Sequence, residues 1–454
     1  MSDMYDIVIR GGRVVTSSTS FDADVGILGE KIAAIGRELK GETIVDASGM
    51  LVTPGAVDIH VHMEMSLGDG LVSSDDFFTG TRAAALGGTT CIVDFVEAKG
   101  KQTLMDAFQQ RNRVAASKAV IDYAFHMTIG PNDIAKLDEV PAVYDAGCTS
   151  FKMYMAYGLR LTDDQMFRAL QAVRDVGGFP VIHAENWDVI TTLIEQNLAR
   201  GNTSPRWHPR SRPAQLEGEA AGRVIDIATY LGVPVHIFHV SCGAVVERIA
   251  RAKAAGLPVT GETCPQYLFL THDAYDEPGV EGMLPVCAPP LRAKTEQAAL
   301  WDALRLGALD IVTTDHCPFT RKEKLRGAND FSKIPGGVPS IEMRFSALYS
   351  EGVQKGHFSE NRWVEMCCSK PAKFVGLANK GEIAVGFDAD IVVFDPNAQK
   401  HLSTETLHEN VDWTPYQGLA VQGWSRHTLS RGQWIVRDGE FVGETGRGKY
   451  VMRR

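Results

Sequence analysis

Residues 220–240, "AAGRVIDIATYLGVPVHIFHV", join two patterns at Gly232. Before the glycine, apolar side chains recur at the spacing of an amphipathic helix. After it comes a short apolar run rich in β-branched and aromatic residues. A helix that leads directly into such a strand is the repeating unit of a parallel sheet. The stretch therefore predicts one helix–strand unit, which ends at His239 and Val240.

The same unit recurs along the middle of the chain. Strands are predicted within residues 50–62, 87–95, 119–129, 147–155, 178–185, 232–240, 256–264 and 308–318, and amphipathic helices within 75–87, 103–118, 163–177, 220–232 and 243–256. Eight strands alternating with helices predict an α/β fold, a (β/α)8 TIM-like barrel. A doubly wound open sheet is the alternative, but no glycine-rich dinucleotide motif follows the first strand.

Both ends of the chain have a different pattern. Short alternating runs separated by glycines occupy residues 5–18, 23–36, 41–49, 381–396 and 427–443. This pattern is typical of antiparallel strands. We predict a small β-sandwich made of residues 1–53 and 378–454, with residues 54–377 as the barrel. The basic tail, residues 446–454, is expected to be frayed and exposed, since chain ends usually are. The alternative is that it reaches a neighbouring subunit.

Composition excludes several classes of partner. The 454 residues are 44% hydrophobic and 22% charged, with a formal net charge of −10. This charge argues against nucleic-acid and acidic-membrane partners, which require a basic face. No signal peptide is visible, and no uncharged apolar run reaches the ~18 residues of a membrane span. The eight cysteines are scattered without a C-x-x-C pair, which favours reduced thiols and a cytoplasmic protein.

Residues that suit metal binding or proton transfer stand at the ends of five predicted strands. They are His60, His62, Lys152, His183, His239 and Asp315. Barrel enzymes carry their chemistry at the C-terminal ends of the strands, so we expect these six side chains to converge there. His126 and His236 are expected to be structural, and His316 to point away from the site.

Four imidazoles and one carboxylate favour Zn²⁺ over Mg²⁺. Two zinc ions require roughly eight coordination bonds, and these ligands with a bridging hydroxide provide about seven. Lys152 would complete the set if CO₂ converted it to a carbamate, N6-carboxylysine. The alternative for Lys152 is a buried lysine paired with an acidic side chain.

Motifs along nearly the whole chain resemble the hydantoinase and dihydropyrimidinase family of the amidohydrolase superfamily. They are "PGAVDIHVH", "DDFFTGTRAAALGGTT", "SFKMYMAY", "VIHAEN", "SRPAQLEGEA", "HIFHVS", "ETCPQYL", "APPLR", "TTDHCPF", "FSKIPGGVPSIEMR" and "KPAKFVGL". The resemblance implies that residues 54–377 form a metal-dependent hydrolase with two zinc ions. It assigns His60, His62 and Asp315 to one ion and His183 and His239 to the other, with carbamylated Lys152 as the bridge. Asp58 would lie behind the ligands or in the packing.

The resemblance also implies a reaction. The ring amide of a 5-substituted hydantoin or a dihydropyrimidine would be opened to an N-carbamoyl amino acid by a bridging hydroxide. Asp315 would take the proton and pass it to the leaving nitrogen. Tyr157 would donate to the carbonyl oxygen, an interaction typically worth ~3 kcal/mol in the transition state.

Substrate contacts are expected at two places. By resemblance, the backbone of Ala288 and Gly336 would hold the ring, although family members commonly have serine and asparagine there. The loop after the first barrel strand carries Met63 and Met65, with Leu67 and Leu71. We expect this loop to form an apolar pocket for the ring substituent; packing on the barrel rim is the alternative.

Three other functions compete with this one. Dihydroorotases usually have an arginine directly after the His-x-His pair, where this chain has Met63 and Glu64. Allantoinases share the metal ligands and are excluded only weakly. Non-catalytic scaffold proteins related to dihydropyrimidinases lack the metal ligands, whereas this chain has a suitable residue at all six ligand positions. The resemblance further implies a homotetramer.

Overall fold

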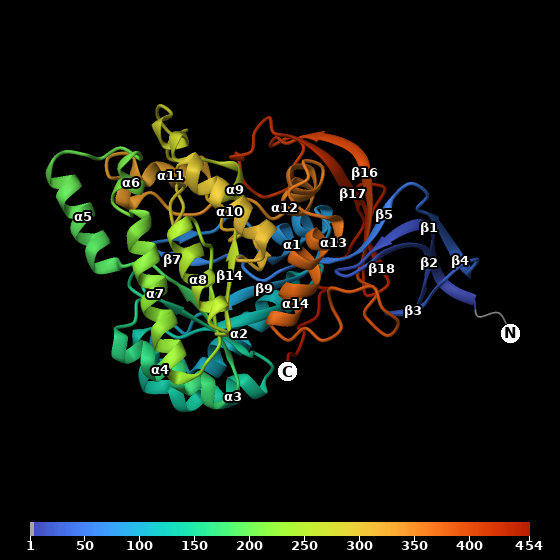
Figure 1. The fold of residues 1–454 in the computed structure, drawn as a ribbon, viewed down its shortest axis with the longest axis horizontal. Coiled ribbons are helices and arrows are strands. Elements are labelled where there is room, and N and C mark those ends of the chain that lie inside the picture. Colours follow the sequence, from blue (N-terminus) through green and yellow to red (C-terminus); the bar gives the residue numbers. More distant parts are fainter. Residues whose placement is uncertain (1–3) are drawn as a thin grey trace.

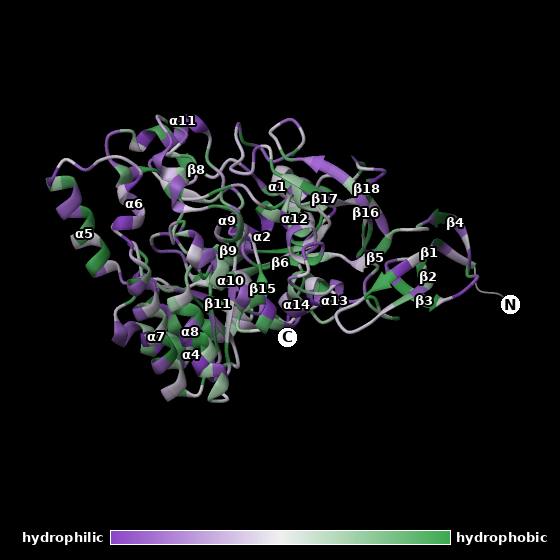
Figure 2. Ribbon diagram, turned by 45° about the horizontal axis from the view of Figure 1, so that its top comes forward, coloured by the Kyte–Doolittle hydropathy of each residue, from purple (hydrophilic) through white to green (hydrophobic). Residues whose placement is uncertain are grey.

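The computed structural model describes residues 4–454, which form two adjoining bodies. Figure 1 shows a group of strands surrounded by helices, and beside it a sheet built from both ends of the chain. Within residues 4–454, no helix is long and apolar enough to cross a membrane. Figure 2 shows hydrophobic residues along strands such as β1, β2 and β6, whereas helices such as α5 and α7 alternate between hydrophobic and hydrophilic residues.

The larger body contains all eight predicted parallel strands in one sheet. In spatial order they are β15 (Ile311–Val312), β14 (Val259–Thr263), β13 (Val235–Ile237), β12 (Phe179–His183), β11 (Ser150–Tyr154), β10 (Asp122–Thr128), β9 (Thr89–Val96) and β6 (Ala56–Asp58). Because the spatial order follows the chain order throughout, the sheet is that of a barrel. The doubly wound alternative is wrong.

The last strand meets the first and closes the circle. The amide of His62 donates to the carbonyl of His316 at 2.9 Å, and Val61 forms a parallel bridge with His316. Deeper in the barrel, the Thr314 hydroxyl donates to Asp58 Oδ2 at 2.6 Å. Arg344 donates to the Val57 and Val312 carbonyls. Asp58, expected behind the ligands or in the packing, therefore joins the two closing strands.

Helices and short turns surround these strands. They are α1 (Phe77–Leu86), α2 (Leu104–Lys118), η1 (Pro131–Glu139), α3 (Val140–Asp145), α4 (Asp163–Asp175), α5 (Trp187–Ala199), α6 (Trp207–Arg210), α7 (Ala214–Leu231), α8 (Gly243–Ala254), α9 (Pro265–Phe269), η2 (His272–Asp276), α10 (Lys294–Leu306), α11 (Arg321–Lys324), η3 (Leu325–Gly327), η4 (Phe331–Lys333), α12 (Arg344–Leu348), η5 (Tyr349–Val353), α13 (Glu360–Val364), η6 (Glu365–Ser369) and α14 (Lys370–Phe374).

Local sequence sets several helix ends. Asp76 caps α1 by accepting from the amides of Phe78 and Thr79, which satisfies donors that the helix leaves unpaired. Helix α7 ends at Gly232, whose left-handed φ of 65° suits a residue without a Cβ atom. Helix and strand therefore join at the glycine that the sequence pattern indicated.

The smaller body is a nine-stranded sheet. It contains β1 (Met4–Val15), β2 (Ser20–Leu28), β3 (Lys31–Gly36), β4 (Lys40–Asp46), β5 (Leu51–Pro54), β16 (Ile391–His401), β17 (Ala420–Ser430), β18 (Gln433–Arg437) and β19 (Glu440–Phe441). Both chain ends contribute, as predicted. Most pairs in this sheet are antiparallel, as predicted, and β4 and β5 pair with β1 in parallel.

The predicted strand over residues 50–62 is two strands in two sheets. Residues Leu51–Pro54 belong to the terminal sheet, and Ala56–Asp58 begin the barrel. Gly55 lies between them, and a Cβ atom there would come within 2.1 Å of the Thr90 hydroxyl. A close approach of backbone at Gly55 thus lets the chain pass from one sheet to the other. The domain limits at residues 53/54 and 377/378 stay a prediction.

The basic tail contradicts the expectation of a frayed end. Tyr450 bridges Tyr123 of the barrel, and the Arg453 side chain is only 1% exposed. Arg453 Nη1 donates to the Ser150 hydroxyl at 2.8 Å, and Nη2 donates to the Phe125 carbonyl. A guanidinium provides five donors, so one side chain satisfies several backbone groups beneath the barrel.

Candidate metal centre and active site

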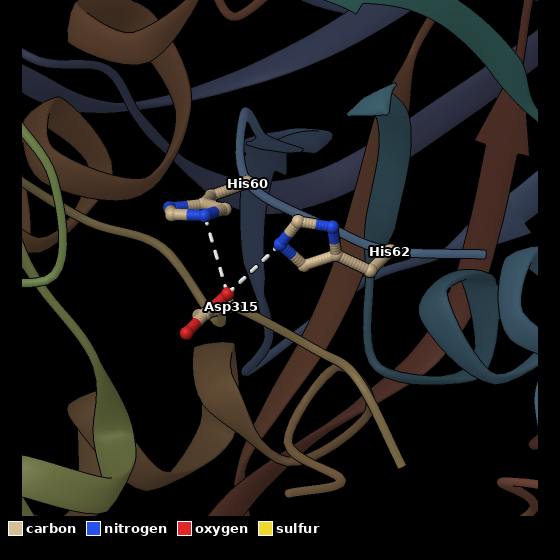
Figure 3. Close-up of side chains that lie close together, drawn as sticks. All are labelled: His60, His62 and Asp315. Atoms are coloured by element: carbon tan, nitrogen blue, oxygen red, sulfur yellow. Dashed lines mark ion pairs between the residues drawn. The ribbon is translucent and has the colours of Figure 1, made fainter. Parts of the chain in front are cut away.

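Three predicted ligands form a compact group at the mouth of the barrel. Figure 3 shows His60 and His62 with their rings directed at Asp315. The two Nε2 atoms lie 3.2 and 3.1 Å from the same oxygen, Asp315 Oδ1. The ligand atoms lie within 4.8 Å of one another, so one metal ion could contact all three.

The environment of His60 keeps its ring neutral and oriented. Its Nδ1 lies 2.5 Å from Glu262 Oε1, which leaves Nε2 facing Asp315. Burial, with Lys152 nearby, lowers the pKa of His60 well below its usual value. A neutral imidazole whose second nitrogen bonds a carboxylate is the form in which histidine binds metals. Sequence reasoning missed Glu262, although this carboxylate ends a predicted strand.

The second predicted pair lies next to the first. The rings of His183 and His239 are 4.5 Å apart, and those of His239 and His60 are 5.3 Å apart. His183 Nε2 contacts Glu185 at 2.8 Å, and Arg212 pairs with the same carboxylate at 2.7 Å. Burial raises the pKa of Glu185, but Arg212 and His183 lower it further, so the group is ionised. Like Glu262, Glu185 orients a predicted ligand and was missed.

Lys152 is buried between the two pairs, among aromatic rings. Its Nζ lies 4.0 Å from the centre of the Phe238 ring and 4.8 Å from that of Tyr154. Burial lowers the pKa of Lys152 to about 7, against the opposing effect of Asp315 and Glu262. The expected alternative, a salt bridge with an acid, does not occur among the ion pairs of residues 4–454.

A cavity of about 290 Å³ connects all six predicted ligands. Its wall also contains Met65, Leu67, Glu97, Tyr154, Tyr157, Leu159, Ala288, Cys317, Gly336 and Gly337. The predicted substrate contacts Tyr157, Ala288, Gly336 and Met65 therefore border the same space as the ligands. Metal and substrate binding by these residues stay predictions.

Met63 is the exception, and its assignment to the substrate pocket is wrong. The side chain is fully buried and packs against Gly80 of α1, where a Cβ atom would come within 2.2 Å of the Met63 sulfur. Its amide donates to Asp94 at 2.7 Å. Leu71 packs on Cys317 and Phe319 instead of lining the cavity. The loop thus supplies Met65 and Leu67 only.

Tyr157 faces the cavity beside His183, with ring centres 5.3 Å apart. Its ring also lies 4.9 Å from that of Trp187, and the Arg212 guanidinium lies 5.3 Å from its centre. Burial raises the pKa of Tyr157, although Arg212 opposes the change. The hydroxyl is therefore protonated at neutral pH and is able to donate.

Lys324 fixes the loop that contains Gly336. Its fully buried Nζ donates to the carbonyls of Val286, Pro335 and Gly337 at 2.8–2.9 Å. Two of these carbonyls flank Gly336, so they are turned toward the lysine and their positions are set. No sequence motif suggested this role, because the three acceptors are backbone atoms.

The remaining candidate histidines are engaged elsewhere. His126 contacts the Ser150 hydroxyl at 2.6 Å, and His236 contacts Thr260 at 2.8 Å. His316 lies 3.0 Å from Asp75. All three are buried, and none borders the cavity. His236 also lies 3.2 Å from Glu262, the carboxylate that contacts His60. Structural roles for His126 and His236 stay predictions.

Most of the chain matches the model of a known protein family. The family model described as "Amidohydrolase family" matches residues 51–435. The chain belongs to the amidohydrolase family. The matched region spans the whole barrel and extends into the terminal sheet.

Within the amidohydrolase family, the chain is similar over nearly its full length to hydantoinases and to a dihydropyrimidinase. A D-hydantoinase of Streptomyces coelicolor is 45% identical over 98% of this chain and 97% of its own. The structure of the dihydropyrimidinase from Brevibacillus agri has a TM-score of 0.96 at 46% identity, covering 98% of both chains. An L-hydantoinase from Arthrobacter aurescens has a TM-score of 0.92 at 30% identity, covering 99% of this chain and 100% of its own. The predicted resemblance to this branch is confirmed.

Proposed function

We propose that this amidohydrolase opens the ring amide of 5-substituted hydantoins and dihydropyrimidines, using two zinc ions. The observation that carries the proposal is the single cavity bordered by His60, His62, Lys152, His183, His239 and Asp315. The similarity to D-hydantoinases and to a dihydropyrimidinase over nearly the full length of the chain supports the choice of substrate.

The donor set fits zinc. His60, His62 and Asp315 would hold one ion, and His183 and His239 the other, with a carbamate on Lys152 between them. Formation of the carbamate requires an uncharged amine, and burial lowers the pKa of Lys152 to about 7. Bound zinc makes hydroxide available at neutral pH and polarises a carbonyl group.

Residues of the protein transfer the proton, donate to the substrate and hold it in place. Asp315 accepts the proton of the attacking water and delivers it to the leaving ring nitrogen, as a general base that then acts as a general acid. Tyr157 donates to the carbonyl oxygen of the ring amide as negative charge develops there. The backbone at Ala288 and Gly336 holds the ring, and Met65 and Leu67 contact its substituent.

The experiment is turnover of hydantoin, dihydrouracil, allantoin and both enantiomers of 5-phenylhydantoin by zinc-replete protein. We expect hydantoins and dihydrouracil to be opened by protein that contains about two zinc ions per chain. A signal from ¹³C-bicarbonate incorporated at Lys152, absent in Lys152→Ala, would identify the carbamate. Preferential opening of allantoin would instead support the allantoinase alternative. Protein with neither zinc nor turnover would contradict the proposal.

Two further proposals follow from the resemblance. The protein is a homotetramer, which light scattering on the purified chain would test. It acts in the cytoplasm, in keeping with eight buried cysteines that are all unpaired among residues 4–454.

A further inference from the structure

A second, smaller cavity adjoins the metal cavity. It has a volume of about 170 Å³ and lies between the end of β9 and α2. The charged residues Glu64, Asp94, Lys99 and Arg111 are among those that line it. Three residues, His62, Met65 and Glu97, border both cavities. The two spaces therefore meet at these side chains.

Most charges of the side cavity are neutralised within the protein. Asp94 pairs with Arg111 at 2.5 Å, and Glu64 pairs with Lys118 at 2.9 Å. Glu97 differs, because its carboxylate appears in none of the hydrogen bonds or ion pairs among residues 4–454. Lys99 borders the side cavity but is exposed and forms no ion pair in the same part of the chain. Glu97 is thus the free negative charge of the shared wall.

The position of Glu97 places this charge on the substituent side of the metal cavity. The proposed ring contacts, Tyr157, Ala288 and Gly336, do not border the side cavity, whereas Met65 does. A substituent that extends along Met65 would therefore approach Glu97. Burial raises the pKa of Glu97, which reflects how far water is excluded from the carboxylate.

We propose that Glu97 makes the enzyme selective for rings whose 5-substituent ends in a cation or a strong hydrogen-bond donor. Rings whose substituent ends in a cation open to N-carbamoyl derivatives of basic amino acids. A partly desolvated carboxylate without an internal partner attracts an ammonium or guanidinium group and repels a carboxylate. The inference rests on the proposed function and extends it to the class of substrate.

The test compares three hydantoins of similar length at position 5, with 4-aminobutyl, pentyl and 4-carboxybutyl substituents. We expect the wild-type enzyme to prefer aminobutyl over carboxybutyl. In Glu97→Gln, the kcat/KM ratio of aminobutyl to pentyl should fall by about tenfold, mainly through a higher KM for the aminobutyl compound. The kcat/KM for pentylhydantoin should change less than about twofold.

Glu64→Gln is the matched control, because Glu64 borders the same cavity but already has Lys118 as a partner. Its aminobutyl-to-pentyl ratio should equal that of the wild type. If Glu97→Gln is active and its aminobutyl-to-pentyl ratio of kcat/KM is unchanged, the proposed role of Glu97 is overturned but the proposed function is not. Wild-type enzyme that opens none of the three rings or unsubstituted hydantoin would overturn the proposed function as well.

Discussion

At the scale of single residues, the site concentrates unusual backbone conformations. Tyr157, His239 and Asp315 have φ values of 64°, 41° and 51°, in the left-handed region that residues with a Cβ atom rarely adopt. Such conformations persist only where the surroundings impose them, and they cluster at functional sites. In this protein they place a phenol, an imidazole and a carboxylate on the wall of one cavity.

Replacing Tyr157 with phenylalanine tests its role as donor. We expect kcat to fall by about 10²- to 10³-fold with little change in KM, because the hydroxyl acts on charge that develops only in the transition state. Steady-state kinetics on hydantoin would measure the effect. A mainly higher KM would show that the hydroxyl binds the ground state, and a full loss of bound zinc would indicate a folding defect.

The sequence predicted the ligand positions because strand ends and residue types can be read directly. It did not predict their partners. Glu262 and His60 are 202 positions apart, and no local pattern indicates that they touch. Met63 was misassigned because the composition of a loop does not tell which of its apolar side chains face the cavity and which pack inward at a turn.

At the scale of elements, the hairpin after the first barrel strand provides apolar side chains of the cavity wall. The hairpin of β7 (Ser66–Gly68) and β8 (Leu71–Val72) follows the two histidines and brings Met65 and Leu67 to the cavity. Leu67 is 47% exposed, although it is apolar. Exposed apolar side chains beside an active site are suited to contact a ligand.

Met65→Glu tests the contact between this loop and the ring substituent. We expect kcat/KM for 5-phenylhydantoin to fall at least tenfold more than that for dihydrouracil, which has no bulky substituent at that position. Parallel kinetics on the two substrates would measure the difference. Equal losses on both would refute a substituent pocket at Met65.

Lys324→Met tests the loop that contains Gly336. The substitution leaves the Pro335 and Gly337 carbonyls without a donor, whereas the Val286 carbonyl still accepts from the Gly337 amide. We therefore expect a loss of stability on the order of 3 kcal/mol and a KM raised more than kcat is lowered. Urea unfolding and steady-state kinetics would measure both effects. Lys322→Met is the control, since Lys322 is exposed on the same short helix, and it should behave as wild type. If KM is unchanged in Lys324→Met, the order of this loop does not contribute to substrate binding.

Alternation of helices and strands was sufficient to predict the barrel, whereas strand lengths were overestimated. The run over residues 308–318 contains only the two-residue strand β15. The residues after it leave the ladder to present Asp315 and to form the contacts of His316. The residues beyond the hydrogen-bonded strand are nearly all buried as well, so burial does not mark where the strand ends.

At the scale of the whole molecule, a buried ion cluster joins the barrel to the terminal sheet. Asp122 of β10 pairs with Lys380 at 2.6 Å and with Arg431 at 3.0 Å. Lys380 also pairs with Asp390 at 2.8 Å, and Arg431 with Glu30. Sequence analysis identified the two bodies but not this connection, because its members lie up to 401 positions apart.

Asp122→Asn should destabilise the protein by about 3–5 kcal/mol, since it leaves two buried cations without their shared partner. Burial raises the pKa of Asp122, but Lys380 and Arg431 lower it further, to below the usual value of 3.8. A carboxylate whose pKa is lowered by folding stabilises the folded state at pH values above its ordinary pKa. This contribution to stability is lost as the pH falls through the lowered pKa. Urea unfolding should therefore show a constant difference from wild type between pH 7 and about pH 5, and a smaller one below. The exposed Asp145→Asn is the control; a difference independent of pH would contradict the ionic explanation.

The buried Arg453 has a consequence for biosynthesis. Its partner Ser150 leaves the ribosome 303 residues earlier, so the strands of the barrel exist long before the segment that covers their lower end. Until then, the Phe125 carbonyl and the Ser150 hydroxyl lack the guanidinium donor that they have in the finished protein. Nascent chains halted before residue 450 should accordingly be cleaved by proteases that spare chains in which this segment has left the ribosome and docked.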